Sequence, residues 1–173
     1  DHTVHITPEE IDIYRHRGVK VAHCPESNMK LASGVAPIPR MLLAGVVVGL
    51  GTDGCASNNN LDMFQEMDTA AKLDKVYTMD PKVMDSRKVL AMATRNAAAA
   101  LGLKHETGSL EPGKRADIIV VDTRSPHLTP LYNPYSHLVY AARGADVRHS
   151  VINGQVVMRD GRLTTLDEEA VMA

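Results

Sequence analysis

The feature that most constrains this chain is residues 46–54, which read Val-Val-Val-Gly-Leu-Gly-Thr-Asp-Gly. Three β-branched residues run into a glycine-rich turn, and a single carboxylate, Asp53, follows the apolar run. This pattern is typical of a buried strand that delivers an acid to a functional loop. Such a carboxylate needs a partner, usually a metal ion or a proton to accept. Because the sequence has no His-X-His pair, the usual companion, we expect the chain to carry only part of a site.

Residues 1–104 show strands alternating with helices. We expect strands at 1–6, 19–23 and 46–51, and helices at 8–17, 37–44, 61–77 and 87–101. The strand ends repeat every 20–30 residues or so, close to the roughly 31 residues per unit of a (β/α)₈ barrel. The sequence therefore predicts an α/β fold with a parallel sheet, corresponding to the C-terminal part of a TIM-type barrel. About the last three units would be present and about five missing.

Local signals mark several element ends. Thr7 and Glu10 predict a capping box at the start of the first helix, and Gly18 predicts its end. Asn60 is expected to cap the helix at 61–77, since asparagine suits an N-cap. Asp80 and the proline that follows it can start a further helix.

The sequence changes in character after residue 104. A turn at 108–114 leads into a strand at 116–121, and a hairpin is predicted by the type I′ signal Asn153-Gly154. Other elements are expected in this order: a proline-rich loop at 125–134, a short helix at 137–142, a second turn at 160–161 and a helical or frayed tail at 166–173. We therefore predict two parts: barrel segment 1–104, and β-rich segment 105–173 that contributes to a small β-sandwich domain.

Asp53 is the leading candidate for chemistry, because barrel enzymes place catalytic groups at the carboxyl ends of strands. The pattern alone fits a turn aspartate equally well. His2 and His5 lie three residues apart, so a strand would point them to opposite faces, and one at most could enter a site. There an imidazole could polarise a substrate or relay a proton. A surface position is the simpler interpretation of His5.

Three further residues are candidates for lining a site. His23 ends the second predicted strand and could contact substrate or fill a structural role. Ser27 and Asn28 follow in a predicted loop, where they could contact ligand heteroatoms or simply form the turn. Cys55 lies beside Asp53, but a thiol without a matched histidine is a weak nucleophile candidate.

Composition argues against several function classes. A net charge of −2 and the lack of a basic patch argue against nucleic-acid binding. No apolar run approaches 18 residues, so no membrane span is expected. Cys24 and Cys55 cannot form a C-X-X-C site, and two isolated cysteines predict free thiols and a cytoplasmic location.

Three segments together resemble the amidohydrolase superfamily. They are His-Thr-Val-His at 2–5, His-Cys-Pro-Glu-Ser-Asn-Met-Lys-Leu-Ala-Ser-Gly at 23–34 and Gly-Thr-Asp-Gly-Cys-Ala-Ser-Asn-Asn at 51–59. In addition, Gly-Ser-Leu-Glu-Pro-Gly-Lys-Arg-Ala-Asp at 108–117 resembles the strand that returns to that superfamily's small sandwich domain. The resemblance covers nearly the whole chain. Within the superfamily it points to the 5′-methylthioadenosine/S-adenosylhomocysteine deaminases and the related chlorohydrolases.

The resemblance implies a mechanism. Such enzymes hold one divalent metal, usually Zn²⁺, with a His-X-His pair, a third histidine and the aspartate after the eighth strand, which Asp53 matches. Asp53 would ligate the metal and take a proton from its water, whose pKa falls to about 7, so that hydroxide attacks C6 of adenine. His2 matches the histidine that helps orient and activate the water, although Asp1 departs from the small residue usual before it. His23 matches a site-lining position. The remaining ligands and a ring-protonating glutamate would lie outside this chain.

We therefore expect a metal-dependent hydrolytic deaminase of adenosine analogues that releases ammonia. Alternatives in the superfamily are a chlorohydrolase or a guanine or 8-oxoguanine deaminase; an alternative of another class is a non-catalytic fragment or scaffold piece. The expected partners are a purine nucleoside substrate and the missing N-terminal part of the same protein, with no nucleic acid and no membrane. The oligomeric state stays open, a homo-oligomer included. This fragment alone is expected to be inactive.

Overall fold

Two sheets organise residues 2–173, the part of the chain that the computed structural model describes. The first part contains α1 (Pro8–Arg17), β1 (Lys20–His23), α2 (Pro25–Lys30), α3 (Ile38–Leu43), β2 (Val47–Leu50), α4 (Met63–Thr78), α5 (Ser86–Ala93) and α6 (Arg95–Ala100). The second part contains β3 (Ile118–Val121), η1 (Pro126–Leu128), α7 (Pro134–Tyr140), η2 (Gly144–Asp146), β4 (Val147–Ile152), β5 (Gln155–Arg159), β6 (Arg162–Leu163) and α8 (Glu168–Met172).

Strands β1 and β2 form a parallel pair, in register from Lys20 opposite Val47 to His23 opposite Leu50. Val21, Val48 and Leu50 are buried and the other apolar side chains are partly buried, as expected of a parallel sheet covered by helices. Helix α6 lies directly on β2, and Gly49 permits this approach because a Cβ there would stand 2.8 Å from the Ala97 Cα. Because the two strands end level with each other, the segments that follow them leave the sheet at the same edge.

The second sheet is antiparallel, in the order β3-β4-β5-β6. The β4–β5 turn has φ of 49° at Asn153 and 80° at Gly154, which are the two positive values that a type I′ turn requires. Asp160 and Gly161 join β5 to β6 with φ of 51° and 76°. Both turn predictions are confirmed. No residue in these four strands is fully buried.

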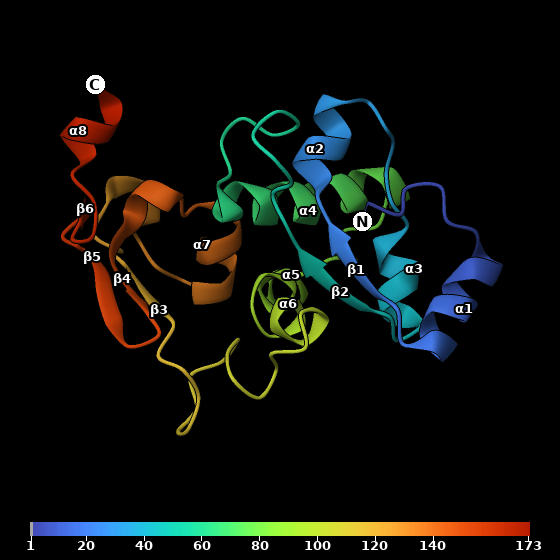
Figure 1. Cartoon of the computed structure of the whole chain (residues 1–173). Coiled ribbons are helices and arrows are strands. Elements are labelled where there is room, and N and C mark those ends of the chain that lie inside the picture. The colour runs from blue at the N-terminus through green and yellow to red at the C-terminus, as the bar shows by residue number, and fades with distance from the viewer. Residues whose placement is uncertain (1) are drawn as a thin grey trace.

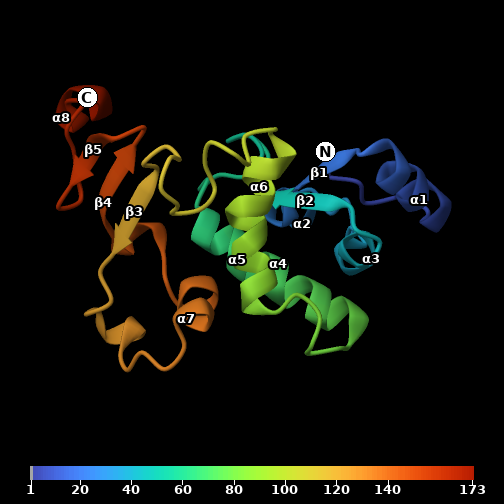
Figure 2. The same cartoon turned by 90° about the horizontal axis from the view of Figure 1, so that it is seen from below.

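Helices α4, α5 and α6 lie between the two sheets (Figures 1 and 2). The core is aliphatic and methionine-rich; its fully buried members include Val21, Ile38, Met41, Val48, Ala70, Ala71, Met84, Val89, Met92, Leu128 and Val139. Helix α7 extends this core by packing on α4 and α5. None of the described helices is long and apolar enough to cross a membrane.

The capping box of α1 is present as predicted. The Thr7 hydroxyl accepts from the Glu10 amide at 3.3 Å, and the Glu10 carboxylate accepts from the Thr7 amide at 2.8 Å. Gly18 ends the helix with φ of 65°, the left-handed conformation that glycine adopts without steric cost.

The predicted strand at 1–6 is wrong for residues 2–6, and Asp1 lies outside the described residues. His2 and Thr3 have φ of 64° and 51°, so the chain turns there instead of extending. One backbone hydrogen bond, from the His2 amide to the Ala22 carbonyl at 3.1 Å, holds this turn against β1. Residues 2–173 therefore contain two parallel strands, where three were predicted.

The predicted helix at 87–101 is broken at Thr94, whose φ of −126° and ψ of −98° are not helical. The break separates α5 from α6 and lets α6 lie against Gly49 of β2. Asp80 opens a turn and no helix; Asp85 caps α5 instead, accepting from the Arg87 and Lys88 amides at 3.1 Å each.

Three smaller differences concern other helix starts. Asp62 caps α4 by accepting from the Phe64 amide at 2.9 Å, whereas Asn60, the predicted cap, accepts from the Asp62 amide at 2.9 Å. Helix α7 starts at Pro134, earlier than predicted, because Asn133 caps it. Ser27 and Asn28, which were expected in a loop, lie in helix α2.

Candidate functional site

Asp53 lies three residues beyond the end of β2, with φ of 60°. Its Oδ2 accepts hydrogen bonds from the Ser57 hydroxyl at 2.6 Å and the Ser27 hydroxyl at 2.7 Å. These bonds, together with one from the Gly54 amide, lower the pKa of Asp53 to about 2. Asp53 is therefore an ionised, exposed carboxylate whose oxygen is fixed by neutral donors.

His2 faces the same oxygen. Its Nδ1 lies 2.8 Å from the Asn28 Oδ1, an acceptor, so Nδ1 carries the proton and donates it. When the ring is neutral, its lone pair is therefore on Nε2, which lies 3.7 Å from the Asp53 Oδ2. That distance is too long for a direct hydrogen bond. Asn28 thus sets the tautomer that presents an acceptor nitrogen toward Asp53.

Helix α2 delivers both supporting groups. It starts immediately after β1, with Pro25 in its first turn, and its adjacent residues Ser27 and Asn28 are buried. Ser27 reaches Asp53 while Asn28 reaches His2. The sequence motif identified these residues, but the interpretation of 27–30 as a loop missed the helix that holds them.

His23 ends β1 and is 1% exposed. Within residues 2–173 neither of its ring nitrogens has a hydrogen-bond partner. Burial, with a smaller contribution from His2, lowers the pKa of His23 to about 3, so the ring is neutral. Both interpretations of His23, a substrate contact and a structural role, therefore stay predictions.

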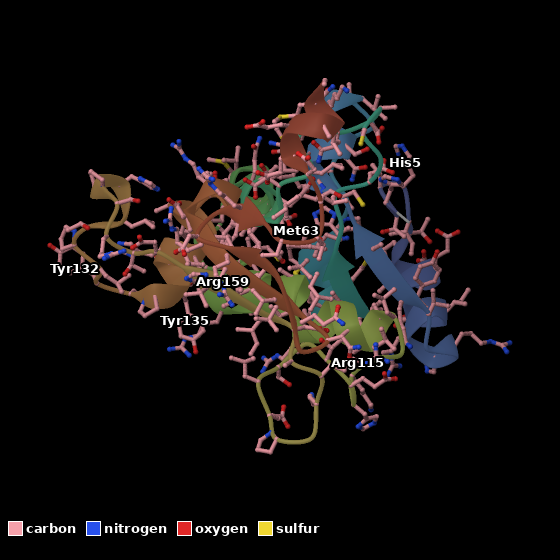
Figure 3. The ribbon with its side chains drawn as sticks, turned by 60° about the vertical axis from the view of Figure 1, so that its left-hand side comes forward. His5, Met63, Arg115, Tyr132, Tyr135 and Arg159 are labelled. Carbon is pink, nitrogen blue, oxygen red and sulfur yellow. The ribbon has the colours of Figure 1, made fainter. Side chains whose placement is uncertain are left out.

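The other two predictions about this region concern His5 and the cysteines. His5 is exposed and lies at the periphery of the N-terminal segment (Figure 3), which agrees with a surface position. Cys24 and Cys55 are both free thiols. Burial raises the pKa of Cys24 to about 11, so this thiol stays protonated beside His23.

Sequence reasoning missed Ser57 and Glu66. Ser57 lies in the turn after Asp53, where its amide bonds to the Gly54 carbonyl. Glu66 is fully buried; its Oε1 accepts from the Asn58 Nδ2 at 2.5 Å and its Oε2 accepts from the Glu26 amide at 3.4 Å. A signal existed, because Glu66 falls on the buried face of α4, whose other buried members are Phe64, Met67, Ala70, Ala71 and Asp74.

The described residues fit part of a metal site. Across 2–173, no three His, Cys, Asp or Glu side chains are grouped so as to hold a metal ion. Asp53 has the character of an oxygen ligand, because it is ionised and its orientation is fixed by neutral donors. His23 adds a neutral imidazole with unpartnered nitrogens at the same edge of the sheet. This donor set suits a metal only if further ligands come from elsewhere.

Comparison with known proteins gives a consistent result. The sequence model of the Amidohydrolase family matches residues 1–157. A 5-methylthioadenosine/S-adenosylhomocysteine deaminase of Syntrophobacter fumaroxidans is 58% identical over 172 residues, 99% of this chain and 39% of the relative. A 5′-deoxyadenosine deaminase of Methanosarcina mazei is 53% identical over 171 residues, with the same two coverages. The chain thus spans about two fifths of the length of the curated relatives it matches.

Solved structures agree with the sequence comparison. The crystal structure of an adenosine deaminase from Xanthomonas campestris, with bound zinc, superposes with a TM-score of 0.96 at 42% identity. The superposition covers 99% of this chain and 39% of that structure. The arrangement of helices and strands described above is therefore one that occurs within a longer enzyme.

Proposed function

This chain belongs to the amidohydrolase family, and from that premise we propose that it forms the C-terminal part of a metal-dependent enzyme that deaminates adenosine analogues. The substrates are 5′-methylthioadenosine and S-adenosylhomocysteine, and the product released is ammonia. The observation that carries this proposal is the ionised Asp53 at the strand end, bonded to Ser27 and Ser57 and faced by His2. The names of the similar relatives support the substrate class.

The proposal includes the architecture of the whole protein. Residues 1–104 contribute the last units of a TIM-type barrel, and 105–173 contribute to a small sandwich domain. The parallel β1–β2 pair with its helices supports the first assignment, and the half-covered antiparallel sheet supports the second. The missing N-terminal part of the protein supplies the remaining strands. A cytoplasmic location remains a prediction from the two free cysteines.

In this proposal Asp53 holds one divalent metal, Zn²⁺, together with ligands from the missing part. When bound, the metal makes a water molecule nucleophilic at neutral pH by lowering its pKa. The overall reaction would exchange the amino group on C6 of the purine for the water oxygen, with one water proton ending on the ring nitrogen and the other on the departing ammonia. Asp53 takes a proton from the water, and His2, whose Nε2 lies 3.7 Å from the same oxygen, helps to orient that water.

The other site residues act on orientation and binding. Ser27 and Ser57 fix the Asp53 carboxylate, while Asn28 fixes the His2 tautomer. His23, Ser27 and Asn28 line the substrate position.

The experiment is to assay the full-length protein with methylthioadenosine, S-adenosylhomocysteine, guanine and a chlorotriazine. The proposal expects the two adenosine analogues to have the highest kcat/KM. Faster turnover of guanine or of the chlorotriazine would contradict it.

A second experiment addresses the alternative of a non-catalytic fragment. Residues 1–173 are expressed alone and analysed for metal and for deaminase activity. We expect no stoichiometric zinc and no turnover. A stoichiometric zinc ion held by these residues would contradict an incomplete site.

A further inference from the structure

The start of helix α2 is held by a residue far away in the sequence. Its N-cap residue, Cys24, makes no side-chain capping bond. The first amides of a helix have no partner within the helix and need an acceptor from elsewhere. The Glu66 Oε2, from helix α4, accepts from the Glu26 amide at 3.4 Å and fills this role. Glu66 therefore acts on the helix that carries Ser27 and Asn28.

The second oxygen of Glu66 holds the loop after β2. Its Oε1 accepts from the Asn58 Nδ2 at 2.5 Å. Asn58 is 4% exposed. Its backbone N–H donates to the Gly54 carbonyl at 2.8 Å, which closes the turn. Ser57, the neighbour of Asn58, donates to Asp53 from that same turn. One carboxylate thus joins the two segments that bring the two hydroxyls to Asp53.

A second contact between α2 and α4 strengthens the same junction. The Glu26 carboxylate accepts from the Gln65 Nε2 at 2.9 Å and from the Thr69 hydroxyl. These bonds fix α2 against α4, but they do not reach the loop that carries Asp53. Lys30, at the end of α2, also donates from its Nζ to the Ala56 carbonyl of the turn at 2.8 Å. Glu66 differs in that it bonds to both segments from a third element, helix α4, where its side chain is buried.

Packing alone does not account for a carboxylate at position 66. Glu66 is 0% exposed, and burying a carboxyl group is unfavourable unless its oxygens are hydrogen-bonded. Burial raises the pKa of Glu66 to about 7, although the bonds from Glu26 and Asn58 oppose that rise. An apolar side chain would fill this place on the buried face of α4 at lower cost. What the carboxylate adds is two acceptor oxygens directed at two donors.

We propose that Glu66 is a positioning residue: its carboxylate clamps helix α2 to the 54–58 turn and so holds Ser27 and Ser57 on Asp53. This inference rests on the proposed function in one respect, namely that Asp53 is a ligand of the metal. Glu66 itself does not touch Asp53, and it acts through the two serines.

The test uses the full-length protein at pH 8, with zinc affinity measured by chelator competition. Glu66→Gln keeps the shape but replaces one acceptor oxygen with an NH₂ group, which then opposes one of the two donors. We expect zinc affinity to fall by about 10–100-fold, the usual effect of losing a supporting contact behind a ligand. Adding Asn58→Asp to Glu66→Gln supplies an acceptor for that NH₂ group, and should restore most of the lost affinity.

A matched control separates positioning from general stability. Met67 is the neighbouring buried residue on α4, and it bonds to neither segment. Met67→Ala should lower the melting temperature and leave zinc affinity unchanged. If Glu66→Gln does not fold, Asn58→Ser replaces it, since that change removes the donor on the loop side of the same clamp, and the same loss of zinc affinity is expected.

The inference would be overturned if Glu66→Gln bound zinc as tightly as the wild type, or if Asn58→Ser did so where it replaces Glu66→Gln. It would also be overturned if the double variant bound zinc no more tightly than Glu66→Gln. Failure of the proposed function is a separate result. A full-length protein that binds zinc with the expected dependence on Glu66 but does not deaminate methylthioadenosine contradicts the proposed function alone.

Discussion

Two valine-rich strands in this molecule run into an aspartate, and the two carboxylates differ in every contact. Asp122 follows β3, and its oxygens accept from the Arg124 backbone amide at 3.1 Å and from the Arg124 guanidinium at 2.9 Å. Asp53 follows β2, and one of its two serine donors, Ser27, lies 26 residues away in the sequence. A turn aspartate finds its partners within its own turn, whereas Asp53 depends on a neighbouring βα unit.

The charges differ as well. Arg124 lowers the pKa of Asp122, and its guanidinium balances the negative charge of that carboxylate in an ion pair. Hydroxyl donors lower the pKa of Asp53 while leaving its negative charge without a counter-charge in direct contact. A carboxylate held in this way is prepared for a cation. The comparison suggests that the chemistry of the partners, more than the strand pattern, separates a site aspartate from a structural one.

The largest expected effect comes from removing the Asp53 carboxylate. Asp53→Ala in the full-length protein should abolish measurable turnover of methylthioadenosine, a loss beyond the roughly 10–100-fold typical of a supporting residue. Zinc content after dialysis should fall as well. Asp122→Ala is the matched control and should retain both. Comparable activity in the two variants would contradict the claim that Asp53 is a site residue and Asp122 a structural one.

Removing the remote donor to Asp53 should have the next largest effect. Ser27→Ala deletes a buried hydroxyl that bonds to Asp53, and we expect kcat/KM to fall by about 10–100-fold. Ser109→Ala is a control, because Ser109 donates to Glu111 within a local turn. Steady-state kinetics on both variants check this. Unchanged kinetics in Ser27→Ala would show that the remote contact is dispensable.

A third aspartate, Asp74, is buried, and in the described part of the chain neither an arginine nor a hydroxyl donates to its carboxylate. Asp74 is 2% exposed, and within residues 2–173 its Oδ2 accepts no hydrogen bond. Burial raises the pKa of Asp74 from its ordinary 3.8 to about 7. Between these pH values the folded chain keeps a proton that the unfolded chain loses. The contribution of this proton to the free energy of unfolding is therefore fully present below about pH 4 and is lost as pH rises through 7.

Asp74→Asn removes this titration. We expect the variant to be more stable than the wild type at pH 8, on the order of 1 kcal/mol, with a smaller difference at pH 5. Urea unfolding of the full-length protein at the two pH values measures both. A variant whose advantage does not grow with pH would contradict a raised pKa at Asp74.

The smallest effect is expected at the Asp122 turn itself. Arg124→Ala removes an exposed ion pair, and such pairs contribute little to stability. The melting temperature and zinc affinity should both stay within experimental error of the wild type. A clear loss of either would mean that the Asp122 turn supports more than its own geometry.

The features predicted from sequence are those with local causes. The α1 capping box and the Asn153-Gly154 turn depend on residues close together in the chain, and both are present. The turn at His2 and the break at Thr94 follow from packing against β1 and β2, which no local signal encodes. In the site, the motif identified Asp53 and Ser27. It missed Glu66, whose partners become apparent only once α2 and α4 are placed together.

The most direct measurement is anomalous diffraction at the zinc edge from crystals of the full-length protein. The account predicts one zinc ion, with an Asp53 carboxylate oxygen about 2.0–2.2 Å away and its other protein ligands outside residues 1–173. Ser27 and Ser57 should still bond to that carboxylate. A zinc ion coordinated without Asp53, or one held entirely by residues of this chain, would contradict it.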